Sequence, residues 1–441
     1  MVLRKNMLAS LLLVFLISLL AVCDYYYYQE RIYSGVYVHQ LPLGGCTLQV
    51  MEETLPKTEV IFHLADGRST VFSLSALGIN PNITHLYTTA HRLGRSRSLP
   101  LTYLERLQLW KNKVNFPLYH TIDEEMLLQT VTTLETRFNK EPKDAFFRIK
   151  SDGKQITINA EEAGLMIDRE ELVRRLVSLL AHPEKALSVR IPENLVPARI
   201  TAASLQEMGI REPIGSFTTL FQGYAEDRVH NIRLAVSHLN NYLIAPGKTF
   251  SLNDILGDST PEKGYRKAPI IVGDQLVSGY GGGLCQVSTT LYNAALLAGL
   301  DIIERHHHNL AVPYVIPGRD ATISYGARDL KFRNNKSHYI LIHANVGQNE
   351  LTFRLFGSPS GERVVIETEI LETRPYPVKH VTDPALTLGH EEITDGEFGY
   401  LVAVWKSVYR GNKEVSRERI YLDDYQPYPA VIKQGAAQAD S

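Results

Sequence analysis

The chain has 441 residues, of which 21% are charged and 44% are hydrophobic, and its formal net charge at pH 7 is −2. This balance excludes the global positive field that holds a polyanion, so we expect no nucleic-acid partner, and the hydrophobic content excludes a disordered chain. The length predicts about two to four domains, three cysteines are too few for a disulfide scaffold, and the composition defines no oligomeric state.

An uncharged segment of 17 residues, 7–23, follows Arg4 and Lys5. As a helix it would be about 26 Å long, close to the roughly 30 Å hydrocarbon core of a bilayer. Because positive charge lies only before it, we expect a cytoplasmic tail of residues 1–6 and an extracytoplasmic remainder. Cleavage as a signal peptide is the alternative, but the only small-x-small sequence, Ala21-Val22-Cys23, is a poor site. We therefore expect an uncleaved, single-pass anchor in the cell membrane.

Residues 35–205 contain an internal repeat of a strand, an Asp-Gly turn, a second strand and a glycine. The two copies read VIFHLADGRSTVFSLSALGINP and AFFRIKSDGKQITINAEEAGLMID. Asp-Gly pairs between β-branched and aromatic runs, here at Gly67 and Gly153, are typical of hairpins. The pattern predicts small α+β units, with helices around residues 103–111 and over residues 169–181.

This repeat and its position resemble the peptidoglycan-binding domain commonly found before VanW domains. The resemblance implies that residues 35–205 bind cell-wall material. A spacer that lifts the downstream part of the chain off the membrane is the alternative interpretation.

The segment GYGGGLCQVSTTLYNAALLAGL places Cys285 one residue after a triple glycine. Apolar residues follow at helical spacing, so we expect the cysteine in the first turn of a helix, where unpaired N–H groups and the helix dipole favour a thiolate. Gly281, Gly282 and Gly283 would admit a substrate backbone, and Gln286 with the N–H of Cys285 would form an oxyanion hole. A buried structural cysteine, or one bonded to Cys46, is the alternative.

Four motifs follow one another within residues 215–356: PGKTFSLN, GGGLCQVSTTLYNA, GRDATISYG and DLKFRN. Together and in this order they resemble the VanW family, named from vancomycin-resistance gene clusters. VanW domains have been linked to peptidoglycan L,D-transpeptidation, which implies an acyl transfer with Cys285 as nucleophile. Arg228 and Asn231 are typical of the family and lie on a predicted helix. We expect them to tie this helix to the cysteine loop rather than to contact substrate.

A thiolate needs a base, and the clustered candidates are His306, His307 and His308 on a strand expected after Asp301. VanW-like sequences usually carry a single histidine followed by serine at this place. The resemblance therefore assigns the base to His308, although Asn309 stands in place of the serine.

A third polar group should orient the imidazole by accepting its second N–H. The candidates are Asp320, Asp329 and Asn334; we prefer Asp320 and expect the other two to give structural support. A metal site is the alternative use of the three histidines. Adjacent histidines point to opposite faces and no third spaced ligand accompanies them, so we expect neither a metal nor a cofactor.

Residues 363–437 alternate apolar and polar side chains, as in VVIETEILETRPYPV and YLVAVWKSVY, which predicts antiparallel strands. Five glycines lie between Lys379 and Ser441. The pattern resembles the G-five domain, which implies binding of N-acetylglucosamine polymers. A β spacer without a ligand is the alternative.

These features predict an α+β multidomain protein with an N-terminal transmembrane helix, an α+β repeat domain, an α+β VanW domain with Cys285 at a helix N-terminus, and a C-terminal antiparallel β module. The resemblances imply binding of peptidoglycan stem peptides and glycan, and L,D-transpeptidase-like acyl transfer. Cys285 would form a thioester, and His308 would then deprotonate an acceptor amine or water, so transfer and hydrolysis both stay open. A non-catalytic wall-binding adaptor that affects wall integrity or glycopeptide susceptibility is the alternative.

Overall fold

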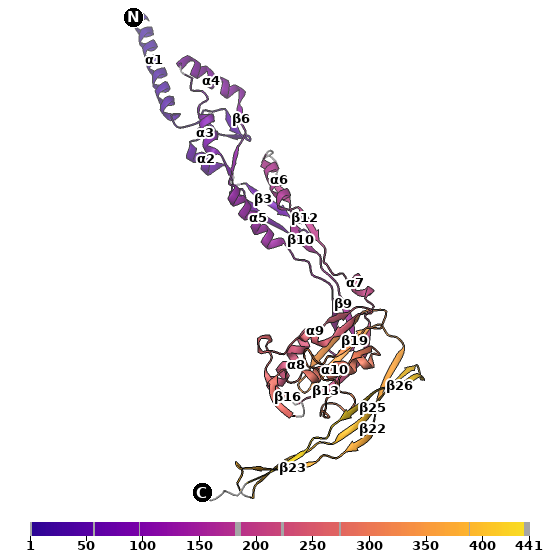
Figure 1. The fold of residues 1–441 in the computed structure, drawn as a ribbon. Coiled ribbons are helices and arrows are strands. Elements are labelled where there is room, and N and C mark those ends of the chain that lie inside the picture. Colours follow the sequence, from indigo (N-terminus) through magenta and orange to yellow (C-terminus); the bar gives the residue numbers. More distant parts are fainter. Residues whose placement is uncertain are drawn as a thin grey trace, which may run out of the picture. The chain divides into compact units, whose positions relative to one another are not determined.

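The computed structural model describes residues 2–55, 58–96, 98–180, 187–221, 225–272, 275–387 and 389–435. It is a mixed α+β structure, which confirms the fold class expected from the sequence (Figure 1). The chain divides into two compact units, of which the first contains residues 1–143 and 162–198 and the second contains residues 144–161 and 199–441. The region predicted as one domain, residues 35–205, therefore contributes to both units.

Helix α1 (Val2–Tyr27) contains the predicted anchor segment. Within Asn6–Tyr27, an 18-residue window has a mean hydropathy of 2.5 and no buried side chain. By length and composition this helix is able to cross a membrane, and a signal sequence has the same properties. It is the one helix of the described residues that meets both criteria.

The rest of the first unit forms two hydrophobic cores. Its elements are α2 (Leu48–Thr54), α3 (Ile83–His91), α4 (Leu99–Asn112), α5 (Glu124–Phe138), α6 (Arg169–Leu180), β1 (Val36–Val38), β2 (Leu41–Pro42), β3 (Glu59–His63), β4 (Ser69–Ser73), β5 (Ile79–Pro81), β6 (Val114–Phe116), β7 (His120–Ile122), β10 (Gly164–Ile167), β11 (Ser188–Arg190) and β12 (Glu193–Val196). One core joins α2, α3 and α4 to the sheet β2-β1-β6. The other packs α5 and α6 against the sheet β11-β3-β4.

The two predicted helices of this unit are present as α4 and α6, whereas α2, α3 and α5 were not predicted. The N-terminus of α5 is capped by Asp123, whose side chain accepts a hydrogen bond from the N–H of Met126. Glu124 and Glu125 follow in the first turn, where negative charge is favourable. The sequence from Asp123 to Glu125 is thus typical of a helix N-terminus, and α5 could have been predicted from it.

Both predicted Asp-Gly hairpins are present. Gly67 joins β3 and β4 at φ 89°, and Gly153 joins β8 (Phe146–Ile149) and β9 (Ile156–Asn159) at φ 67°. Glycine adopts this backbone conformation without steric cost, which explains its presence at both turns. The copies differ in their packing, because β3 also pairs with β11, whereas apolar residues of β8 and β9 pack in a core of the second unit.

The second unit is built on the antiparallel sheet β13-β21-β20-β14. Besides β8 and β9, its elements before the C-terminal module are α7 (Ala202–Glu207), α8 (Glu226–Leu239), α9 (Leu252–Leu256), α10 (Leu284–Leu297), β13 (Glu212–Leu220), β14 (Tyr242–Ile244), β15 (Thr249–Ser251), β16 (Lys267–Val272), β17 (Gln275–Tyr280), β18 (Asp301–Glu304), β19 (Lys331–Arg333), β20 (Ile340–Val346) and β21 (Glu350–Gly357). Helix α10 lies so close to β13 that a Cβ at Gly215 would be 2.3 Å from the carbonyl oxygen of Ala294. Residues of α8, α10 and the sheet share one hydrophobic core.

The C-terminal module also lies in the second unit. Its strands are β22 (Glu362–Arg374), β23 (Val378–Asp383), β24 (Glu391–Thr394), β25 (Gly399–Arg410), β26 (Lys413–Tyr425) and β27 (Ala430–Gly435). The sheet β22-β25-β26 is antiparallel throughout, as predicted. In the sheet β23-β27-β24, however, β23 and β27 run parallel, so the module is not purely antiparallel. A period-two pattern marks strands but does not determine their relative direction.

Candidate active site

Cys285 is the second residue of α10, which confirms the predicted position at a helix N-terminus. The N-cap is Gly283, in the left-handed region at φ 111°. Every residue from Gln286 to Leu296 is buried, so packing on all sides fixes the position of the helix. Cys285 itself is half-buried and free, so the alternative disulfide with Cys46 is not formed in this structure. Cys285 is therefore held at a defined, half-buried place.

The three glycines before α10 pack against the chain's own backbone and side chains. A Cβ at Gly282 would lie 2.7 Å from the carbonyl oxygen of Pro269 on β16, and a Cβ at Gly283 would lie 2.9 Å from Ile232 Cγ1 on α8. Gly281 has φ 79°. Because α8 and β16 occupy the space beside Gly282 and Gly283, the packing of the chain itself requires these two glycines, and the admission of a substrate backbone stays a prediction.

His308 comes to Cys285 through the segment that follows β18. This strand ends at Glu304, so the histidines lie beyond it, and an antiparallel bridge between His306 and Thr322 aligns the two segments around the sulfur. Burial raises the pKa of the Cys285 thiol, but hydrogen bonding and the charge of His308, with a contribution from Thr322, lower it overall to about 7. The Thr322 hydroxyl lies 3.4 Å from Cys285 Sγ.

Asp320 orients the imidazole of His308. Its Oδ2 accepts hydrogen bonds from His308 Nδ1 at 2.6 Å and from the His308 backbone N–H at 2.7 Å. Burial lowers the pKa of His308, but its hydrogen bonds to Asp320 and Cys285 raise it overall to about 9. Because the thiol has the lower pKa, this arrangement favours a thiolate–imidazolium pair between about pH 7 and pH 9.

The second oxygen of Asp320 is held by residues that the sequence analysis did not name. Oδ1 accepts hydrogen bonds from the hydroxyl of Tyr425 and from Arg305 Nη2, at 2.5 and 3.3 Å. Arg305 in turn donates from Nη1 to both carboxylate oxygens of Asp423, each at 2.7 Å. Burial raises the pKa of Asp320, but His308 and Arg305 lower it overall to about 2. The carboxylate is therefore ionised, and both of its oxygens are engaged.

Tyr425 and Asp423 lie on β26, so the C-terminal module forms one side of this site. The module contacts both loops that carry the candidate residues. The N–H of Gln426 donates to the carbonyl oxygen of Asn309 at 2.8 Å, and the N–H of Gly318 donates to the Tyr425 hydroxyl at 2.7 Å. A Cβ at Gly318 would lie 2.9 Å from Val404 of β25. The histidine loop and the Asp320 loop are thus both attached to the module.

The side chain of Gln286, for which the sequence predicts a role in an oxyanion hole, is engaged in the core. Its Nε2 donates to Thr219 Oγ1 at 3.0 Å and to the carbonyl oxygen of Leu220 at 2.9 Å. Its Oε1 accepts from Arg228 Nη2 at 2.9 Å. The N–H of Cys285 has no acceptor among the described residues, which leaves it as a candidate donor to an oxyanion.

Arg228 connects α8 to the first turn of α10, and Asn231 connects α8 to the loop before α10. The fully buried Asn231 donates from Nδ2 to the carbonyl oxygens of Arg266 and Gly282, at 2.9 and 3.1 Å, and its Oδ1 accepts from the Arg266 N–H. Arg228 contacts Gln286 as described above. Both side chains therefore stabilise the position of the segment that carries Cys285.

Asp329 and Asn334 support other parts of the second unit. Asp329 accepts hydrogen bonds from Ser251 Oγ at 2.6 Å and from the N–H of Asn253 at 2.9 Å, at the start of α9. Asn334 donates to the carbonyl oxygens of Ile244 and His338, at 3.0 and 2.9 Å. Of the three residues considered for orienting the imidazole, Asp320 is the one that contacts it.

The other two histidines have partners of their own. His306 Nε2 lies 3.1 Å from Glu304 Oε1, and the His307 ring packs on the ring of Tyr425 with a centroid distance of 5.2 Å. The described residues contain no group of three or more His, Cys, Asp or Glu side chains arranged to hold a metal ion.

Sequence reasoning missed Arg305, Tyr425, Asp423 and Tyr314. Burial raises the pKa of Tyr314 well above its usual value, and the negative charges of Cys285 and Asp320 raise it further. Asp423 and Tyr425 alternate along one strand, which places them on one face. The sequence predicts that Asp423 and Tyr425 share one face of a strand. It does not predict which part of the chain packs against that face.

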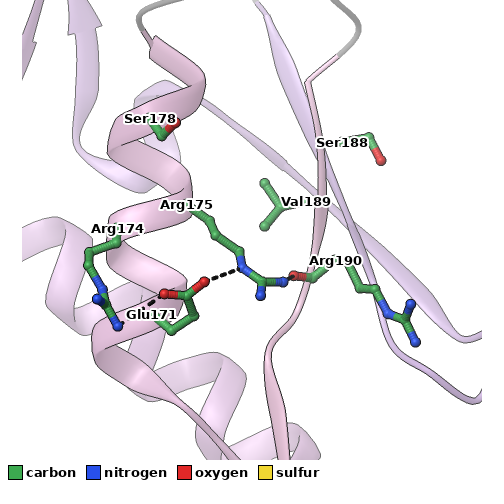
Figure 2. Close-up of a pocket in the computed structure, with 7 residues that line it drawn as sticks. All are labelled: Glu171, Arg174, Arg175, Ser178, Ser188, Val189 and Arg190. Atoms are coloured by element: carbon green, nitrogen blue, oxygen red, sulfur yellow. Dashed lines mark hydrogen bonds and ion pairs between the residues drawn. The ribbon is translucent and has the colours of Figure 1, made fainter.

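The first unit carries an open cavity of its own between α6 and β11, with a volume of about 420 Å³ (Figure 2). Arg174, Arg175 and Arg190 line it together with Glu171. Glu171 binds both Arg174 and Arg175, at 3.0 and 2.8 Å, and Arg175 also donates to the carbonyl oxygen of Arg190. Three guanidinium groups and one carboxylate leave a net positive lining, which is suited to an anionic ligand.

Three family models match the chain in series. The model "Putative peptidoglycan binding domain" matches residues 70–186, "VanW like protein" matches residues 227–356, and "G5 domain" matches residues 362–437. Uncharacterized protein YoaR of Bacillus subtilis (strain 168) is 32% identical over 280 residues, which cover 63% of this chain and 90% of that protein. Vancomycin B-type resistance protein VanW of Enterococcus faecalis (strain ATCC 700802 / V583) is 38% identical over 117 residues, which cover 25% of this chain and 42% of that protein.

Two solved structures, the IgA1 protease G5 domain and HP0197-G5, are 19% and 17% identical to short parts of the chain, with TM-scores of 0.13 and 0.11. They cover 18% and 17% of this chain, and 94% and 97% of those structures. The three matched domains define a cell-wall-associated protein. Within that class, this chain belongs to the VanW-like family.

Proposed function

We propose that this protein is a membrane-anchored cysteine acyltransferase of the L,D-transpeptidase type, which acts on peptidoglycan outside the cytoplasm. The observation that supports the proposal is the contact series from Cys285 through His308 to Asp320 at the N-terminus of a rigid helix. A nucleophile, a base and a carboxylate that orients the base are the parts that covalent acyl transfer requires. Helix α1 would be the uncleaved anchor.

In the first step, the thiolate of Cys285 attacks the carbonyl carbon of a peptide bond in a stem peptide. A carbon–sulfur bond forms, the carbon–nitrogen bond breaks, and the imidazolium of His308 gives its proton to the departing amine. The N–H of Cys285 would stabilise the oxyanion of the tetrahedral intermediate, because it lies at the positive end of α10. The products are a thioester and a free amine.

In the second step, an acceptor amine from another stem peptide attacks the thioester carbonyl. Its proton passes to His308, the new amide bond forms, and the thiolate of Cys285 is released. Water in place of the amine would give hydrolysis by the same residues. We favour transfer, because peptidoglycan bound along the chain would supply acceptor peptides at high local concentration.

A second candidate function is a wall-binding adaptor without catalysis. The cavity lined by Arg174, Arg175 and Arg190 favours it, because guanidinium groups bind carboxylates and stem peptides carry several. The C-terminal module would add contacts to glycan. In this case Cys285 would serve only to pack the start of α10.

Intact-mass analysis of the full-length protein in detergent, incubated with purified tetrapeptide muropeptides, tests the proposal. The wild type should gain the mass of an acyl adduct and release cross-linked or trimmed muropeptides. Cys285→Ser should form no product and still bind peptidoglycan. Cys46→Ser is the matched control, because Cys46 is also a free thiol, and it should behave like the wild type.

The adaptor predicts a different pattern. Wild type and Cys285→Ser would then bind peptidoglycan equally, with no adduct and no new muropeptide in either sample. That result, from protein shown to be folded, would contradict the catalytic proposal.

A further inference from the structure

Helix α4 of the first unit has its polar and apolar sides reversed. The side chains directed into the unit are those of Thr102, Glu105, Arg106 and Leu109, of which only the last is apolar; Thr102 and Leu109 are 6% and 8% exposed. The exposed side carries apolar residues instead: Leu101, Tyr103, Leu104, Leu107 and Trp110, with exposures of 55%, 40%, 53%, 62% and 70%. A helix that faces water shows the opposite distribution.

This reversal is more than a scatter of surface leucines. Leu101, Leu104, Leu107 and Trp110 follow each other at intervals of three residues, so they form one apolar stripe that winds about halfway around the helix over its exposed side. A contiguous apolar stripe of this length is rare on a surface that water covers. The exposed side of α4 is therefore suited to an apolar environment.

The position of α4 indicates which apolar environment this is. Arg106, in the middle of the helix, forms an ion pair with Asp24 and a hydrogen bond with the hydroxyl of Tyr33. Its guanidinium carbon also lies 3.8 Å from the centre of the Tyr33 ring. Asp24 is the residue that directly follows the apolar segment 7–23 of α1. Figure 1 shows α4 near α1, and the Arg106–Asp24 pair joins it to the point where the apolar segment ends.

We propose that α4 is a second membrane contact, an interfacial helix whose apolar stripe is inserted in the outer leaflet of the bilayer that α1 crosses. The proposal rests on the anchoring role proposed for α1. Trp110 and Tyr103 suit the boundary between headgroups and acyl chains, where amphipathic rings are enriched. Lys111 lies on the exposed side in the last turn, and its long side chain reaches back to the headgroups.

The chain offers a direct test, because it contains two tryptophans, Trp110 and Trp405. Trp405→Phe leaves Trp110 as the only indole, and Trp110→Phe leaves Trp405, which hydrogen-bonds to Glu369 in the C-terminal module. Each full-length variant is reconstituted into phosphatidylcholine vesicles with brominated or ordinary acyl chains. Flotation of the vesicles on a density gradient reports whether α1 anchors the protein, independently of fluorescence.

Brominated acyl chains should reduce the emission of Trp110 by about half or more, because its indole would be in contact with them. The emission of Trp405 should not change. A double variant, Leu104→Asp with Leu107→Asp in the Trp110-only protein, should float equally well and lose most of the quenching. Both leucines are exposed, so these changes should leave the folded state intact.

Protein that floats with equal Trp110 emission in both kinds of vesicle would overturn the proposal. A lipid-independent change of Trp110 emission with protein concentration would also overturn it, since a second copy of the chain would then cover α4. Protein that does not float would contradict the anchor, and the interfacial position of α4 with it. Acyl transfer by Cys285 is measured separately, so none of these outcomes is confused with a failure of catalysis.

Discussion

The hydroxyl of Tyr425 donates a hydrogen bond to Oδ1 of Asp320, so a strand of the C-terminal module touches the carboxylate that orients His308. The same hydroxyl accepts a hydrogen bond from the buried N–H of Gly318. The matched G5 segment is therefore more than an appended wall-binding module. It completes the environment of the candidate site.

Replacing Tyr425 by phenylalanine should impair the site without changing its shape. The Gly318 N–H loses its acceptor and Asp320 loses a donor, so we expect a loss of about 1–3 kcal/mol in the free energy of unfolding. The pKa of Asp320 should rise, since one of the groups that lowers it is gone. Weaker orientation of His308 should then slow alkylation of Cys285 at pH 7.5.

The matched control is Tyr409→Phe in the neighbouring strand β25. Its hydroxyl donates to Glu414 at an exposed place, so unfolding and alkylation should stay close to the wild type. Denaturant unfolding and iodoacetamide labelling measure both effects. If Tyr425→Phe labels at the wild-type rate across pH, the module does not influence the site.

The pH dependence of Cys285 alkylation should follow its lowered pKa of about 7. Below pH 7 the sulfur is a thiol and labelling slows, and above pH 9 His308 loses its proton, so acyl transfer should be maximal between these values. In His308→Gln, burial of Cys285 is no longer offset by the imidazolium, and the labelling midpoint should move upward. His306→Gln should keep the wild-type midpoint, because His306 contacts Glu304 instead. If the pH dependence of labelling in His308→Gln is identical to that of the wild type, His308 does not lower the pKa of Cys285.

Asp423 should be essential for stability, although it lies outside the matched VanW segment. It is the bidentate partner of Arg305, whose side chain is 1% exposed. Asp423→Asn would leave this buried cation with fewer negative partners, at a cost of about 3–5 kcal/mol. The adjacent Asp424 pairs with Arg374 at the surface, where it is 51% exposed. Asp424→Asn should cost less than about 1 kcal/mol. Equal unfolding midpoints for the two variants would contradict the assigned network.

Substitution of Gln286 distinguishes a structural role of its side chain from a catalytic one. Since its amide is fully engaged with Thr219, Leu220 and Arg228, Gln286→Met should lower the free energy of unfolding by about 2–3 kcal/mol. The folded fraction should keep most of its acyl-transfer rate. A true oxyanion donor would give the opposite result, a stable protein with a rate reduced about 10²–10³-fold. Thermal unfolding and the rate per folded molecule distinguish the two.

Several features could be predicted because they depend on local sequence. The hairpins at Gly67 and Gly153 require a positive φ that glycine supplies, and the apolar periodicity after Cys285 defines a buried helix with the sulfur at its start. The pairing of Asp320 with His308 was also accessible, as one of three polar candidates, because the VanW-like motifs limited the choice. These signals lie within one or two turns of backbone or within one motif.

Other features depend on which helices and strands pack against each other, and the spacing of residues in the sequence does not predict this. The glycines before Cys285 face α8 and β16, and Gln286 faces β13, because α10 is enclosed on all sides. Likewise, the sequence of α4 predicts that its apolar side packs in the core, and only the structure shows that this side is exposed. The sequence by itself thus indicated most strands, the helix that begins at Cys285, and Cys285 and His308 as the candidate nucleophile and base. Only the tertiary structure decided that Arg305, Asp423 and Tyr425 surround Asp320, because a buried carboxylate takes its partners from whatever strand packs against it, however distant in the chain.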